Sequence, residues 1–147
     1  MHYKKVRFEI CNRSGESDLS ISFEFEPDNR LCVYRVDGPV TPGRLLEAFG
    51  KAVASPGWSD DYNFLTLLNK ISLADLSHEA IDHLMSVMEE NDTAKPSGSK
   101  RLAAIVSEDP ACDGILIYWE HQAAKKLKTQ ERVFRSERLA REWLASV

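Results

Sequence analysis

The chain has 147 residues, of which 43% are hydrophobic and 29% are charged, and its formal net charge at pH 7 is −4. These values are typical of one globular domain and exclude a second full-sized domain, a disordered chain and a collagen-like repeat. An acidic balance has the wrong sign for a general nucleic-acid binder, whose affinity comes from cations on phosphates. The sequence has neither an apolar run of about 18 residues nor an apolar signal core near its start, so we expect a cytoplasmic protein without integral membrane association.

The first part of the chain predicts antiparallel strands. Over residues 19–26 apolar and polar residues alternate, which is the period of a strand with one face in water. The apolar members are Leu19, Ile21, Phe23 and Phe25. After the break at residues 27–29, residues 31–36 offer a second strand, and the pair is typical of a hairpin. Residues 3–10 predict a further edge strand.

Beyond residue 40, apolar segments expected as strands alternate with amphipathic helices. The strands are expected at residues 64–68, 102–106 and 131–134. The four helices are expected to begin at the capping residues Thr41, Ser77, Asp109 and Ser136. Their inward faces are predicted to carry Leu45, Leu46, Phe49 and Val53, then Ile81, Leu84, Met85 and Met88, then Cys112, Ile115, Leu116, Trp119 and Ala123, and finally Leu139, Ala140, Trp143 and Leu144. Residues 91–100 predict a mobile loop or lid.

This order of elements predicts an α/β fold in a single domain. We expect a mixed β-sheet in which an N-terminal antiparallel hairpin is followed by alternating strands and helices. The later strands are expected to run parallel and to be joined by right-handed crossovers.

Three segments resemble the SpoIIAA-like, STAS/SEC14-type bacterial proteins. They are Val36-Asp37-Gly38-Pro39-Val40-Thr41 before a helix, the strand at 64–68 with Asp75-Leu76-Ser77 before the next helix, and Val133-Phe134-Arg135-Ser136 with Ala140-Arg141-Glu142-Trp143-Leu144. The resemblance covers about residues 30–146 and leaves residues 1–29 as an N-terminal strand extension of one domain, 1–147. It implies a mixed sheet flanked by helices. The STAS members that antagonise anti-sigma factors act by binding a partner protein, and phosphorylation of a serine at a helix start switches that binding. The resemblance implies the same kind of action for this chain.

Ser77 is the residue that matches this serine, and Asp75 and His78 accompany it as a candidate regulatory group. A phosphate at a helix N-terminus would meet unpaired backbone amides. The antagonists carry adjacent serines followed by glycine, whereas Leu76 precedes Ser77 here and His78 follows it. The alternative is that Ser77 is a plain helix cap, which contributes about 1 kcal/mol.

The residue patterns of common enzymes and metal sites do not occur in the sequence. The glycines never cluster into a phosphate or dinucleotide loop, and no Gly-x-Ser-x-Gly elbow lies between a strand and a helix. The cysteines Cys11, Cys32 and Cys112 fit neither a disulfide framework nor a zinc knuckle. Asp75 and His78 form an acid/base pair, but such charges also stabilise helix starts. We expect no catalytic residue, cofactor or metal, and no enzymatic activity.

The function predicted first is a non-enzymatic STAS-like regulatory or protein-interaction module, whose partner is another protein or a second copy of the chain. The alternative is a binder or carrier of an apolar or lipid-like small molecule, which the SEC14 side of the resemblance implies. The candidate pocket residues are Trp58, Phe64, Met85 and Trp119. Tryptophan at helical spacing also occurs in ordinary cores, so both interpretations stay open.

Overall fold

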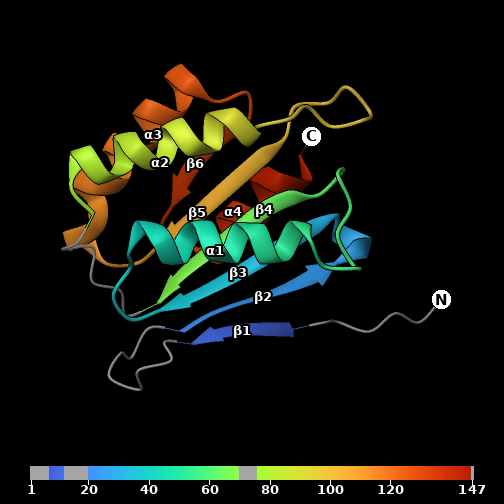
Figure 1. The fold of residues 1–147 in the computed structure, drawn as a ribbon, viewed down its shortest axis with the longest axis horizontal. Helices are drawn as coiled ribbons and strands as arrows, with labels where there is room; N and C mark the ends of the chain where they lie inside the picture. Colours follow the sequence, from blue (N-terminus) through green and yellow to red (C-terminus); the bar gives the residue numbers. More distant parts are fainter. Residues whose placement is uncertain (1–6, 12–19, 70–75, 147) are drawn as a thin grey trace.

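The computed structural model describes residues 7–11, 20–69 and 76–146, which form a six-stranded sheet flanked by helices (Figure 1). The strands are β1 (Arg7–Cys11), β2 (Ser20–Glu26), β3 (Leu31–Asp37), β4 (Asn63–Asn69), β5 (Leu102–Ser107) and β6 (Gln130–Phe134). The α-helices are α1 (Pro42–Val53), α2 (His78–Asn91), α3 (Asp113–Lys126) and α4 (Glu137–Ala145), and two short 3-10 helices are η1 (Pro27–Asn29) and η2 (Pro110–Cys112).

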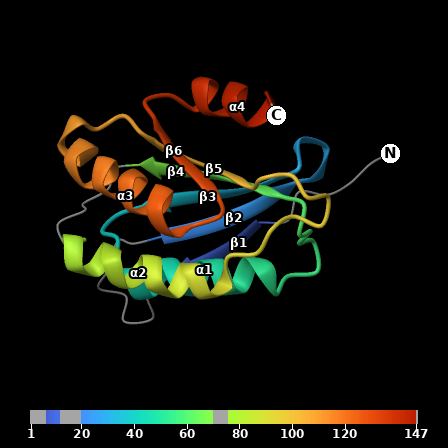
Figure 2. The ribbon, with the colours of Figure 1, turned by 90° about the horizontal axis from the view of Figure 1, so that it is seen from above.

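The strands lie in the sheet in the order in which they occur in the chain. β1, β2 and β3 pair antiparallel, whereas β3 to β6 pair parallel. Right-handed crossovers that all step in one direction place their helices on one face of the sheet. Accordingly α1, α2 and α3 share one hydrophobic core, and α4 packs on the opposite face (Figure 2). The predicted α/β fold, a hairpin followed by alternating strands and helices, is confirmed.

Each face of the sheet has its own core because successive side chains of a strand point to opposite faces. Tyr34 and Phe23 belong to the core under α1–α3, and Val33 and Leu65 belong to the core under α4. β5 is buried along its whole length, as its uninterrupted apolar composition predicts.

The predicted helix caps are confirmed. The side chains of Thr41, Ser77 and Ser136 accept hydrogen bonds from backbone N–H groups in the first turns of α1, α2 and α4. Asp109 caps η2, which leads into α3. The edge strand expected at residues 3–10 begins at Arg7, and residues 3–6 lie outside the described residues.

Three sequence predictions about burial are wrong. Val53, predicted on the inward face of α1, is 51% exposed at the last residue of that helix. Leu139 is 42% exposed, because α4 buries Ala140 and Leu144, and Leu139 lies about 100° around the helix from Ala140. The predicted water-facing side of β2 is partly covered: Ser22 and Glu26 are buried, and α4 lies over this face at Glu26. Among the described helices, none combines the length and apolarity needed to span a membrane.

Candidate functional site

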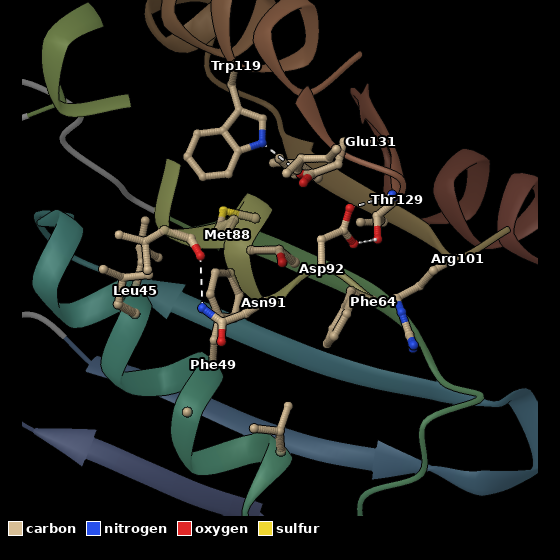
Figure 3. A pocket seen from close by; sticks show the side chains of 18 of the residues that line it. Leu45, Phe49, Phe64, Met88, Asn91, Asp92, Arg101, Trp119, Thr129 and Glu131 are labelled. Atoms are coloured by element: carbon tan, nitrogen blue, oxygen red, sulfur yellow. Dashed lines mark hydrogen bonds between the residues drawn. The ribbon is translucent and has the colours of Figure 1, made fainter. Parts of the chain in front are cut away.

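A cavity of about 770 Å³ opens between the sheet and helices α1, α2 and α3 (Figure 3). Small-molecule sites in proteins commonly have about 300–1,000 Å³. Its apolar lining comes from Val40, Leu45, Leu46, Phe49, Val53, Trp58, Phe64, Leu68, Leu76, Val87, Met88, Ala103, Ile105, Leu116, Trp119 and Leu127. The cavity therefore has the size and the predominantly apolar wall of a ligand site.

Two small residues explain why space remains at this position. Phe64, Ala103 and Glu131 are register neighbours on β4, β5 and β6, so the short side chain of Ala103 lies between two long ones on the cavity floor. On the helix side, Gly50 of α1 lines the cavity, and a Cβ atom at Gly50 would meet no neighbouring atom within 4 Å. Larger residues at either position would project into the open volume.

The cavity is polar at one end and apolar at the other. Arg101 and Thr129 directly precede β5 and β6, so they mark the end at which the parallel strands begin. Leu68 and Leu116 lie where β4 ends and α3 begins, at the opposite end. Figure 3 shows Arg101 and Thr129 on one side of the cavity and Leu45 on the other. This polarity matches an amphiphile rather than a pure hydrocarbon.

Arg101 is the buried cation of the polar end, with 6% of its surface exposed. Its Nη1 donates a hydrogen bond of 2.5 Å to the backbone carbonyl of Tyr62. Its guanidinium carbon lies 6.0 Å from the ring centroid of Trp58 and 5.9 Å from that of Phe64. Burial lowers the pKa of Arg101, against the attraction of the carboxylates around it.

Glu131 is the half-buried acid of the cavity wall. Nε1 of Trp119 donates a hydrogen bond of 2.7 Å to its Oε1. Burial raises the pKa of Glu131 to about 7, and the negative charge of Asp92 acts in the same direction, while the Trp119 hydrogen bond lowers it. Near neutral pH the carboxyl group therefore exists in both protonation states, as a donor and as an acceptor.

Asp92 closes the rim of the cavity between α2 and β6. Its carboxylate accepts hydrogen bonds from the hydroxyl of Thr129 at 2.8 Å, from the backbone N–H of Thr129 at 3.2 Å, and from the backbone N–H of Lys128. The segment predicted as a lid is thus anchored at its first residues, and Asn91 and Thr93 line the cavity beside Asp92. Its role as a lid stays a prediction.

Three of the four predicted pocket residues line this cavity: Trp58, Phe64 and Trp119. The prediction for Met85 is wrong, because Met85 is fully buried in the closed core beneath α2. Met88, about one turn further along α2, lines the cavity instead.

Sequence reasoning did not single out Gly50, Asp92, Arg101 or Glu131 as site residues. The available signals were a cation directly before an apolar strand and an acid alternating with Val133 on the last strand. Neither signal is specific without the strand register.

The candidate regulatory group lies apart from the cavity, at the start of α2. Ser77 is exposed, and its hydroxyl accepts a hydrogen bond of 3.0 Å from the N–H of Ala80. The ring of His78 stacks on that of Tyr118 at 3.9 Å, and the hydroxyl of Tyr118 donates to Asp82. Asp75 lies outside the described residues. In the part of the chain that the structure describes, no group of three His, Cys, Asp or Glu side chains is placed to hold a metal ion.

The chain was compared with protein-family models, curated proteins and solved structures. No protein-family model and no curated protein matches it. A solved structure similar to it is described as an uncharacterized protein of the DUF3478 family with a SpoIIAA-like fold, from Shewanella loihica PV-4. The two chains are 14% identical, the match covers 98% of each, and the TM-score is 0.45. The fold described above rests on its own strand order and pairing.

Proposed function

We propose that the protein binds an apolar, lipid-like small molecule in the cavity between the sheet and helices α1, α2 and α3. The observation that carries the proposal is the cavity itself, about 770 Å³ with a mostly apolar wall and one polar end. Protein interiors are close-packed, and voids larger than a water molecule are few in a domain. The apolar wall rather than the size distinguishes this cavity, because a second cavity of about 710 Å³ has a more polar lining.

Water is a poor occupant of the apolar end. A bound water needs two to four polar partners, whereas Leu68, Ile105 and Leu116 offer hydrocarbon. An apolar ligand restores the dispersion contacts that the open space forfeits. The stabilising contribution of a ligand thus comes mainly from burial of its own hydrocarbon and of these side chains.

The test is the affinity for decanol, a neutral amphiphile, in two matched glycine variants. Gly50 and Gly43 both lie in α1 with open space around an added Cβ, and only Gly50 lines the cavity. We expect Gly50→Leu to weaken decanol binding by about tenfold or more, because the leucine occupies ligand volume. Gly43→Leu should bind like the wild type. Both variants remove a helical glycine, which favours the helix, so unfolding would not explain a loss.

Equal affinities in the two variants, or no binding of decanol by the wild type, would refute the proposal. Native mass spectrometry of the freshly purified protein gives an independent readout. Extra mass that disappears on denaturation is expected from a retained ligand and would give its formula.

The role as a non-enzymatic regulatory or protein-interaction module stays a prediction, with a protein or a second copy of the chain as its partner. The cytoplasmic location and the lack of enzymatic activity stay predictions as well. Ser77 is available to such regulation because its side chain is exposed at the start of α2, the helix that carries Met88 to the cavity.

A further inference from the structure

Arg101 is buried without a counter-ion. Only 6% of its surface is exposed, and one of its donors is used by the carbonyl of Tyr62. Among the described residues, no carboxylate lies within ion-pair distance of its guanidinium. Buried charges in proteins are normally paired, because an uncompensated charge loses its hydration. The unpaired charge of Arg101 therefore points to a missing anion.

Two of the three carboxylates that attract Arg101 are held by other donors, whereas the third, Asp61, has a buried Oδ1 with no hydrogen-bond partner among the described residues and lies beyond ion-pair distance of the guanidinium. Asp60 accepts a hydrogen bond of 2.8 Å from Nε1 of Trp58, and Asp92 is occupied by Thr129. They attract Arg101 from a distance, and the lowered pKa of Arg101 shows that this attraction does not offset its burial. Lys95, a second cation of this region, also has a lowered pKa, through burial and through repulsion by Arg101.

We propose that the cavity ligand is an amphiphile with a carboxylate head group, which pairs with the guanidinium of Arg101 while its alkyl chain lies toward Leu68 and Leu116. This inference rests on the proposed function and names its ligand class. A carboxylate fits because its two oxygens match the planar, parallel N–H donors of a guanidinium. A doubly charged phosphate fits less well, because the negative charges of Asp60 and Asp92 surround the same end.

The aromatic rings beside Arg101 favour this geometry. The rings of Trp58 and Phe64 stack at 5.6 Å between centroids, and the guanidinium carbon lies about 6 Å from each. Both rings line the cavity beside the guanidinium, so apolar surface borders the place where the head group would lie. An ion pair formed there is screened less than one on the surface.

The test compares three ligands with the same ten-carbon chain: decanoate, decanol and decylamine. Binding is measured by calorimetry at about pH 6, where decanoate is charged and Glu131 is mostly protonated. We expect the wild type to prefer decanoate to decanol by about tenfold or more, and to bind decylamine most weakly. In Arg101→Met the ratio of decanoate to decanol affinity should fall by about tenfold.

Two further variants complete the design. Arg101→Lys keeps the positive charge and should keep a preference for decanoate. Arg138→Met removes an exposed arginine from α4, on the opposite face of the sheet, and should leave the ratio unchanged.

The outcomes separate this inference from the proposed function. Equal binding of the three ligands, a preference for decylamine, or an unchanged ratio in Arg101→Met would overturn the carboxylate head group and leave the cavity as an apolar site. Binding of none of the three, decanol included, would overturn both. If Arg101→Met does not fold, the order of the three ligands on the wild type still decides whether the site prefers an anion.

Discussion

The indole Nε1 of Trp119 donates a hydrogen bond of 2.7 Å to Oε1 of Glu131, joining α3 to β6 at the wall of the cavity. Trp119 lies near the middle of α3, and Glu131 is the second residue of β6. The bond fixes the carboxyl group against the helix that covers it. The ionisation of Glu131 is therefore coupled to folding.

Glu131→Gln should remove a pH-dependent loss of stability. The pKa of Glu131 is raised from 4.5 to about 7 in the folded protein, so the unfolded chain loses this proton first as the pH rises. The free energy of unfolding should fall between pH 4.5 and about 7, by on the order of 3 kcal/mol at most. Urea denaturation of both proteins at intervals across this range measures the difference. Parallel profiles for wild type and variant would contradict the raised pKa.

Arg141→Met should cost about 3 kcal/mol of stability. Nη1 and Nη2 of Arg141 on α4 donate to both carboxylate oxygens of Glu26 on β2, at 2.8 and 3.0 Å. Only 6% of the Glu26 side chain is exposed, so removal of the arginine takes two charge-assisted hydrogen bonds from a buried carboxylate. The exposed pair of Arg138 and Glu142 on the same helix is the control, and Arg138→Met should change stability by less than about 0.5 kcal/mol. Similar losses of stability in both variants would show that the ion pair of Arg141 with Glu26 stabilises the fold no more than an exposed pair does.

Ligand binding should change the fluorescence of the two cavity tryptophans and leave the fluorescence of Trp143 unchanged. Trp58 and Trp119 line the cavity, whereas Trp143 packs on Phe134 in the core under α4. In Trp143→Phe the change produced by decanol should persist. In a Trp58→Phe, Trp119→Phe double variant it should disappear. A signal that follows Trp143 instead would place the ligand on the other face of the sheet.

Ser77→Ala should cost about 1 kcal/mol, because the N–H of Ala80 loses its acceptor at the start of α2. Ser77→Asp should keep most of the stability, since aspartate caps as well as serine. Thermal unfolding of the two variants measures this. Equal stability of Ser77→Ala and wild type would mean that the hydroxyl does not stabilise the helix, and its regulatory role would then be the better explanation for a serine here.

The sequence alone determined the order and type of the elements, because these depend on short-range signals. Alternation of apolar residues defined β2, and capping side chains such as Thr41, Ser77 and Ser136 defined where helices begin. The sequential order of the parallel strands, which the sequence did not predict, is what places three helices on one face through right-handed crossovers.

Only the tertiary structure showed where the cavity lies and which charged side chains surround it. Ala103 became a cavity floor only because its neighbours in register are Phe64 and Glu131, residues that are distant in the chain. Met88 rather than Met85 reaches this space, and Arg101 lies beside two stacked aromatic rings with no counter-ion among the described residues. Periodicity shows which face of an element is buried, but the volume enclosed between elements depends on the sizes of side chains brought together by register and packing.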